Sequence, residues 1–162
     1  MSNCIFCAIA QNTAPAWVIY EDEHTMAFLD IAPATDGHTL VIPKRHVRDL
    51  WELSEADGRH VMVAAKRVAE WIKRALSPDG VNLFHATGAA AFQSVFHFHL
   101  HVVPRYNGDR VRKPWEPQPG DRDKMAAIAE RIRRAARWEG KILMRWGESH
   151  RRLNLLLESR TI

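Results

Sequence analysis

Histidine alternates with bulky apolar residues in the run His97–Val103, and this pattern constrains the fold more than any other in the chain. Successive side chains of a β-strand point to opposite faces, so the run predicts a strand with one apolar face and one imidazole face. The apolar face would hold Phe98, Leu100 and Val102, and the opposite face would hold His97, His99 and His101. Same-face positions lie roughly 6.6 Å apart, so two neighbouring imidazoles could share an ion, whereas three would have to converge over about 13 Å. A row of imidazoles suits a site that binds an anion, attacks it and moves protons, although a single histidine is more often structural.

Other segments of the chain also have the composition and length of strands. They are Val18–Tyr20, Thr25–Leu29, His38–Ile42 and Val81–Phe84, and the histidine run belongs to a fifth strand over Val95–Val103. An acidic turn at residues 21–24 joins the first two strands, and Pro43 closes the third. Short connections of this kind favour an antiparallel sheet with helices packed on one face, which is an α+β fold.

One long helix is predicted between the third and fourth strands. Ser54, with Asp57 three positions later, resembles a capping box that is weakened by Asp in place of Glu or Gln. The apolar residues that follow at helical spacing are Val61, Ala64, Ala65, Val68, Trp71, Ile72 and Ala75. The turn-forming segment Ser77–Gly80 then ends the helix.

The chain after residue 110 differs in composition from the part before it. Residues 1–110 predict one domain, residues 111–120 a proline-rich linker, and residues 121–162 a basic helical extension packed on the domain. Asp121 would cap a helix whose apolar face holds Met125, Ile128, Ala129, Ile132 and Ala136. The excess of positive charge belongs to this extension, and its helix carries Arg131, Arg133, Arg134 and Arg137. These arginines favour a solvated helix face over a nucleic-acid patch, and the leucines from Leu153 onward need burial, for which a second subunit is one candidate.

The sequence contains no sign of a membrane span or an export signal. No apolar run approaches the roughly 18 residues needed to cross a bilayer. The N-terminus has no basic stretch followed by an apolar one. We therefore expect a cytoplasmic protein.

Motifs on both sides of the histidine run extend the pattern. They are Phe28–Pro33, Gly37–Lys44, Gln93–Val95 and Pro104–Arg105. Together they resemble the histidine triad (HIT) family of nucleotide hydrolases and transferases over about residues 3–110. The resemblance implies the family's α+β fold, a homodimer, and a purine nucleotide as the substrate.

By this resemblance His99, the middle histidine, is the nucleophile. Neutral imidazole attacks a phosphorus that carries oxyanions without charge repulsion, and the resulting phosphoramidate is then cleaved by water. A backbone carbonyl is the expected partner of the other ring nitrogen of His99. His101 would bind phosphate oxygens or protonate the leaving group, and His38 would complete the phosphate site. Gln93 and the backbone N–H of Ser94 would donate hydrogen bonds to the developing oxyanion.

The same resemblance implies a nucleoside site. Asp30 follows a predicted strand and would accept hydrogen bonds from the ribose hydroxyls, although the residue alone is only an acid at a strand end. The residues that match the wall of the purine site are Phe6, Ile9, Phe28 and Ile31, each of which could also be an ordinary core residue. An apolar slot of this kind selects weakly between bases, because every base can stack.

The two cysteines form a Cys-x-x-Cys pair at Cys4 and Cys7. A disulfide is not expected in a reducing cytosol, and the pair lacks the strand and helix of a thioredoxin-like motif. HIT proteins with a structural zinc have a similar pair together with histidines that correspond to His46 and His97. The resemblance therefore implies zinc on four protein ligands, while the alternatives are reduced thiols that hold nothing and a catalytic metal on the triad itself.

Two departures from the family pattern bear on the substrate. The usual Asn-x-Gly before the triad reads Ala86-Thr87-Gly88, and Phe92 replaces the usual Gly before Gln93. Phe92 would narrow the pocket or lean over the leaving group.

We predict hydrolysis at the α-phosphate of a purine nucleotide derivative, either a dinucleoside polyphosphate or a nucleoside phosphoramidate. The sequence after the triad more closely resembles the branch of the family that cleaves dinucleoside polyphosphates. The alternatives are a nucleotidyl transferase or phosphorylase, and a nucleotide-binding regulator without turnover.

Overall fold

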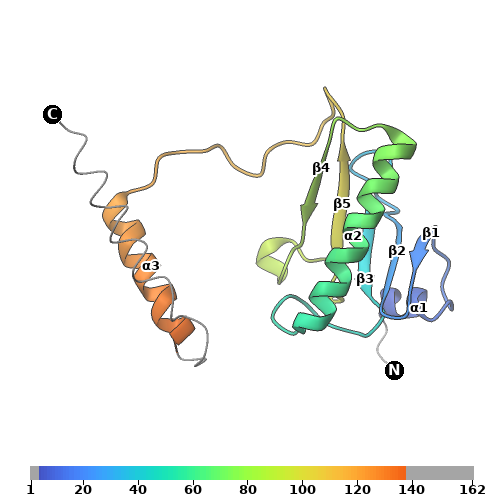
Figure 1. Ribbon diagram of the computed structural model, residues 1–162, viewed down its shortest axis with the longest axis horizontal. Helices are drawn as coiled ribbons and strands as arrows, with labels where there is room; N and C mark the ends of the chain where they lie inside the picture. The colour runs from blue at the N-terminus through green and yellow to red at the C-terminus, as the bar shows by residue number, and fades with distance from the viewer. Residues whose placement is uncertain (1–3, 138–162) are drawn as a thin grey trace. The chain divides into compact units, whose positions relative to one another are not determined.

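The computed structural model describes residues 4–137 and divides the chain into two compact units, Met1–Arg112 and Lys113–Ile162 (Figure 1). The first unit contains a five-stranded antiparallel sheet in the order β1-β2-β3-β5-β4. Its strands are β1 (Val18–Glu21), β2 (Thr25–Leu29), β3 (Thr39–Pro43), β4 (Gly80–Phe84) and β5 (Leu100–Arg105). Its helices are α1 (Ile5–Ala10), α2 (Glu55–Leu76) and the short 3₁₀ helix η1 (Ala89–Ala91). The predicted α+β fold is confirmed.

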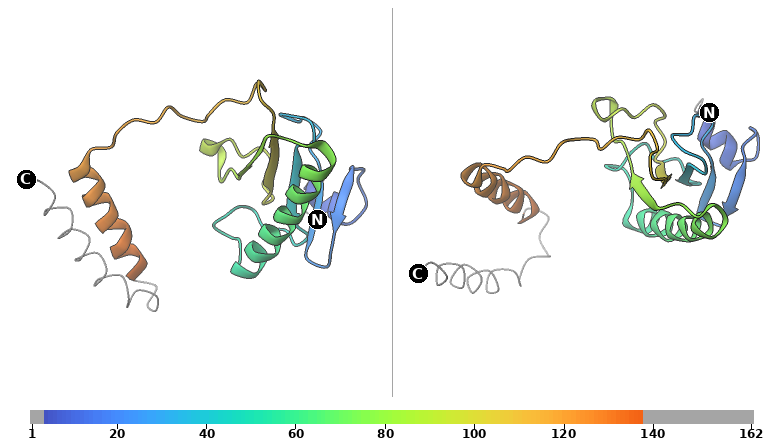
Figure 2. Two further views of the ribbon diagram at one scale, coloured as in Figure 1. Left: turned by 45° about the horizontal axis from the view of Figure 1, so that its top comes forward. Right: turned by 90° about the horizontal axis from the view of Figure 1, so that it is seen from above.

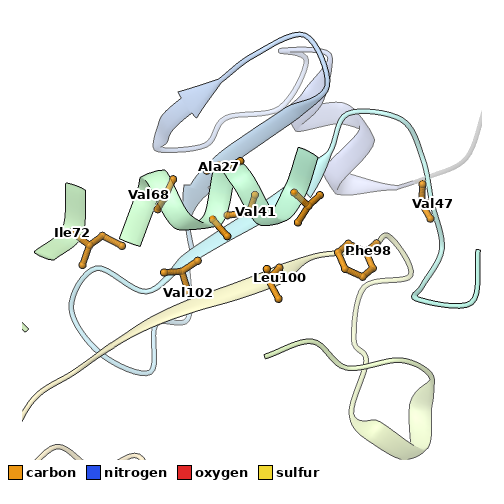
Figure 3. Close-up of a cluster of buried hydrophobic side chains, with 11 residues drawn as sticks. Ala27, Val41, Val47, Val68, Ile72, Phe98, Leu100 and Val102 are labelled. Atoms are coloured by element: carbon orange, nitrogen blue, oxygen red, sulfur yellow. The ribbon is translucent and has the colours of Figure 1, made fainter. Parts of the chain in front are cut away.

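Helix α2 covers one face of the sheet and buries the larger part of the core. Figure 3 shows Val68 and Ile72 of the helix packed over Val41 and Val102 of the central strands. Ser54 caps the helix as predicted, because its Oγ accepts a hydrogen bond from the backbone N–H of Asp57 at 3.1 Å. The alternation of each strand therefore decides which residues face α2 and which face away.

Helix α1 lies on the opposite face of the sheet from α2, and the sequence pattern did not predict it (Figure 2). Phe6 and Ile9 pack there against Phe28 and Leu40 of the sheet. The helix is only six residues long and its N-cap, Cys4, makes no side-chain capping bond. It is formed by burial against the sheet and has no local signal of its own.

The predicted strand over Val95–Val103 is only partly right, because β5 begins at Leu100. Strand β3 pairs with β5 from Val41↔Leu100 onward, so the residues before Leu100 have no ladder partner. The backbone N–H of Phe98 instead donates to the carbonyl of Val47 at 2.6 Å. The alternation persists through this irregular stretch, since Phe98 joins the core under α2 and His99 faces the other side.

The second unit contains α3 (Arg122–Arg137). Asp121 caps this helix as predicted, with its Oδ1 accepting from the backbone N–H of Lys124 at 2.8 Å. Glu130 forms ion pairs with Arg133 and Arg134. The packing of the extension on the first unit stays a prediction, and the leucines from Leu153 onward lie outside the described residues. Within residues 4–137 no helix has the length and apolarity needed to cross a bilayer.

Candidate active site

Histidine side chains gather on the face of the sheet that α2 does not cover. His99 precedes β5 and His101 belongs to it, so the two side chains share one face with ring centroids 5.0 Å apart. His38 comes from the turn before β3, the neighbouring strand. The sheet therefore brings together the three histidines that the sequence pointed to, and His38 and His99 are both buried.

The proton on His99 is placed by the backbone. Its Nδ1 lies 2.7 Å from the carbonyl oxygen of His97, as the sequence led us to expect. A carbonyl can only accept, so Nδ1 carries the proton and Nε2 keeps the lone pair. His99 lines a pocket on this face, and Nε2 is the ring nitrogen available to a ligand there.

A second hydrogen-bond chain sets the protons on His38 and His101. The backbone N–H of Ala34 donates to His38 Nδ1 at 3.1 Å, so the proton of His38 sits on Nε2. His38 Nε2 then donates to His101 Nδ1 at 2.9 Å, which leaves the proton of His101 on Nε2. Asp30 Oδ2 is 3.6 Å from His38 Nε2. Because that nitrogen carries a proton, the Asp30–His38–His101 cluster is poorly suited to hold a metal ion.

Burial keeps these imidazoles neutral. Burial first, and then the nearby His99 and His38, lower the pKa of His101 to about 4. Burial also lowers the pKa of His99, and it lowers the pKa of His38 against the opposing pull of the Asp30 carboxylate. The site therefore offers neutral nitrogen, the form that can attack an anionic phosphorus centre.

The pocket next to these histidines has a volume of about 780 Å³. It is lined by Ile5, Phe6, Ile9, Pro15, Ala16, Trp17, Phe28, Leu29, Asp30, Ile31, Ala32, Leu40, Ser94, Val95, His99 and His101. Each of the four apolar residues predicted for the purine site is among them. Phe6, Ile9 and Phe28 are buried, whereas Ile31 is 86% exposed at the rim. The pocket thus joins an apolar slot to an imidazole cluster.

A separate cluster of cysteine and histidine side chains lies beside α1. Cys4 Sγ and Cys7 Sγ are each 3.5 Å from His97 Nδ1, and Cys7 Sγ is 3.2 Å from His46 Nδ1. His97 Nε2 donates to the carbonyl of Pro43 at 2.9 Å, so its Nδ1 presents a lone pair to the sulfurs. The four ligand atoms lie within 4.8 Å of one another. Two thiols and two imidazoles at this spacing fit tetrahedral zinc.

Comparison with known proteins decides the family. A family model for the HIT domain matches residues 11–108. The chain belongs to the HIT family. A curated relative, the Hit protein of Bacillus subtilis, is 42% identical over 120 residues, which cover 74% of this chain and 83% of the relative.

Solved structures of HIT proteins have the same fold. A zinc-bound histidine triad family protein from Mycobacterium smegmatis is 43% identical with a TM-score of 0.66, covering 81% of this chain and 96% of its own. A histidine triad nucleotide-binding protein from Candida albicans is 26% identical with a TM-score of 0.76, covering 83% of this chain and 97% of its own. HIT membership supports nucleotide binding and hydrolase or transferase activity in general.

The side chain of Gln93 is hydrogen-bonded to the protein backbone in this HIT protein, whereas we expected it to donate to an oxyanion. Its Nε2 donates to the carbonyls of Arg48 at 2.8 Å and Val95 at 3.1 Å. Its Oε1 accepts from the backbone N–H of Gly88 at 2.8 Å. The side chain therefore holds the loop before the triad in place, and Ser94 is the neighbour that reaches the pocket.

Sequence reasoning missed two aromatic residues next to the HIT histidines. The ring of Phe84 stacks on His101 with centroids 4.4 Å apart, because the two residues are paired between β4 and β5. His85 Nδ1 donates to the carbonyl of His99 at 2.9 Å, and its Nε2 is 2.8 Å from Thr87 Oγ1. The strand register could have identified Phe84, but no local pattern pointed to His85.

Proposed function

We propose that this HIT protein hydrolyses a purine nucleotide derivative at its α-phosphate through a nucleotidyl intermediate on His99. The observation that carries the proposal is the 2.7 Å contact of His99 Nδ1 with the carbonyl oxygen of His97, which assigns the proton to Nδ1 and leaves the Nε2 lone pair for the pocket. Nε2 attacks phosphorus and forms a P–N bond while the bond to the leaving group breaks. The Nε2–H of His101 donates a hydrogen bond to the leaving oxygen, and a phosphoanhydride leaving group departs as a phosphate anion without needing a proton.

Water then completes the reaction. It attacks the phosphorus, the P–N bond breaks, and the electron pair returns to His99 Nε2. The proton that the water loses passes to solvent, and His99 returns to its neutral form with the proton on Nδ1. His38 keeps His101 in the tautomer that this cycle needs, because its Nε2–H donates to His101 Nδ1.

The nucleoside half of the substrate fits the apolar end of the pocket. Phe6 and Phe28, whose ring centroids are 5.4 Å apart, form the inner wall for a purine together with Ile9, and Ile31 covers the rim. Asp30 Oδ1 accepts from the backbone N–H of Ala32 at 2.8 Å, which fixes the carboxylate at the end of β2. We assign Asp30 to the ribose hydroxyls.

We further propose that zinc binds to Cys4, Cys7, His46 and His97. Four protein ligands close the coordination sphere, so the metal supplies stability and no Lewis-acid chemistry. The catalytic alternative would use His99 as a ligand and so remove the nucleophile. Both sulfurs lie 3.5 Å from His97 Nδ1, which supports the structural site.

Replacing His99 by Asn tests the proposed reaction. We expect kcat to fall on the order of a thousandfold or more, with AMP affinity within a few-fold, because no other group supplies the attack. The matched control is His60→Asn on α2, which should retain wild-type turnover. A His99→Ala variant that keeps a tenth of the wild-type rate would contradict the assignment, and a labelled nucleotidyl group trapped on His99 would support it.

The same assay separates the two alternatives. Turnover should be measured on a panel of adenylyl compounds with and without inorganic phosphate. Products that incorporate phosphate would identify a phosphorylase, and AMP binding without any turnover would identify a regulator. We expect turnover that is independent of added phosphate.

A further inference from the structure

Phe92 has an unusual backbone conformation and an unusual exposure. Its φ is +68°, in the left-handed region that residues with a Cβ rarely adopt. Its side chain is 91% exposed, more than any other large hydrophobic residue in the described part of the chain. The strained backbone therefore does not bury the ring of Phe92 in the core.

Hydrogen bonds hold the strained residue in place. The backbone N–H of Phe92 donates to the carbonyl of Ala89 at 3.0 Å, and that of Gln93 donates to the carbonyl of Gly88 at 3.2 Å. The buried side chain of Gln93 ties the same turn to Arg48 and Val95. A strained residue that its surroundings over-determine is typical of ligand sites. The ring is thus presented to solvent from a rigid loop.

The position of Phe92 relates it to the pocket. It lies two residues before Ser94, which lines the pocket, so the two Cα atoms are at most about 7.6 Å apart. Phe92 itself is not part of the pocket wall. It can therefore contact only a part of a ligand that projects out of the pocket.

We propose that Phe92 is a stacking platform for the aromatic base of the leaving group, so that the preferred substrates carry a second nucleoside. This inference rests on the proposed function, which places the first nucleoside against Phe6 and Phe28. Hydrogen bonds already restrain the backbone that carries the ring, and an exposed aromatic side chain offers a flat face on which a base can stack. The subsite tolerates any base, because every base has a π-face.

Two substrates that differ only in the second nucleoside test the subsite. Diadenosine tetraphosphate carries it and adenosine 5′-tetraphosphate lacks it. We expect Phe92→Leu to raise KM for the first on the order of tenfold and to leave KM for the second within twofold. Phe92→Tyr, which keeps the ring, should behave as wild type. Equal effects on both substrates, or none on either, would overturn the subsite.

Controls separate stacking from folding and from the reaction itself. Phe92→Gly relieves the backbone strain, so its melting temperature should equal or exceed that of the wild type while the preference for the second nucleoside is lost. Met62→Ala, which removes a half-exposed side chain from α2 on the other face, should change neither KM. If the wild type hydrolyses both substrates and Phe92→Leu changes nothing, only the subsite fails. If the wild type neither binds AMP nor hydrolyses either substrate, the proposed function fails and the subsite fails with it.

Discussion

At the scale of single residues, hydrogen bonds give each histidine of the triad a different environment. The first, His97, donates from Nε2 to Pro43 and turns Nδ1 toward the two thiols. The second, His99, donates from Nδ1 and keeps Nε2 for the pocket. The third, His101, accepts at Nδ1 from His38. In the proposed mechanism one residue type thus serves as a metal ligand, a nucleophile and a hydrogen-bond donor, according to which ring nitrogen is bonded.

Burial of His101 makes the stability of the fold sensitive to acid. The unfolded chain binds a proton at this residue below its ordinary pKa of 6.5, whereas the folded chain binds one only near 4. Between these values the unfolded state holds more protons, so the free energy of unfolding should fall as pH falls. Replacing His101 by Asn should reduce the slope of the free energy of unfolding against pH by the contribution of about one bound proton. Denaturant titrations at pH 7, 6 and 5 measure the slope, and an unchanged slope would contradict a depressed pKa.

At the scale of elements, Gly37 fixes the turn that delivers His38 to β3. Its φ is +83°, and a Cβ at this position would lie 2.5 Å from Leu76 Cδ1 and 3.3 Å from Pro104 Cγ. The turn therefore packs directly on the end of α2. The turn also fixes the backbone position of the neighbouring His38, whose carbonyl accepts a hydrogen bond from the backbone N–H of Asp30 at 2.9 Å.

We predict that Gly37→Ala destabilises the protein and lowers its activity. Left-handed strain and the clash with Leu76 should together cost about 2–4 kcal/mol in the free energy of unfolding. Gly108→Ala is the matched control, since Gly108 has the same φ of +83° but no atom within 4 Å of an added Cβ. It should lose only the strain contribution of about 1 kcal/mol. Equal losses in the two variants, measured by urea denaturation, would show that the packing against α2 does not matter.

At the scale of the whole molecule, the proposed zinc ligands come from parts of the chain that are distant in sequence. Cys4 and Cys7 belong to α1 and its N-cap, His46 follows β3, and His97 precedes β5. A bound zinc would fasten α1, and with it Phe6, against the sheet. The ring of Phe6 also meets His99 edge-on at 5.3 Å, so the metal would stabilise one wall of the pocket from behind.

Removing the zinc ligands should weaken the fold and spare the chemistry. When free zinc is present at a hundred times its Kd, its binding adds about 2.7 kcal/mol to the free energy of unfolding. Cys4→Ser and Cys7→Ser should therefore each lower the melting temperature by about 10 °C or more. Turnover should survive below the new transition, because His99 is not a ligand. Elemental analysis and thermal melts check both points. Full zinc occupancy in the variants, or lost activity in folded protein, would contradict a structural zinc.

The exposed apolar surface of α2 and β4 is the basis for expecting a homodimer. Val63 on α2 and Val81 and Leu83 on the edge strand β4 line one groove and are between 42% and 51% exposed. An edge strand with free backbone groups pairs readily with another chain. We expect sedimentation at micromolar concentration to give a dimer, and Leu83→Lys to shift it toward monomer. A wild type that sediments only as monomer would contradict this prediction.

The sequence by itself determined the strands, α2 with its cap, and the division of the histidine run into core and site faces. These features depend on periodicity and capping, which are local properties of the chain. Only the tertiary structure decided where β5 begins, that α1 exists, and that Phe84 and His85 stand beside the triad. Ladder pairing, burial and cross-strand contact join residues far apart in the sequence, and no local pattern records them. The protons on His38, His99 and His101 were decided in the same way, because each depends on a hydrogen-bond partner that only the folded chain brings within reach.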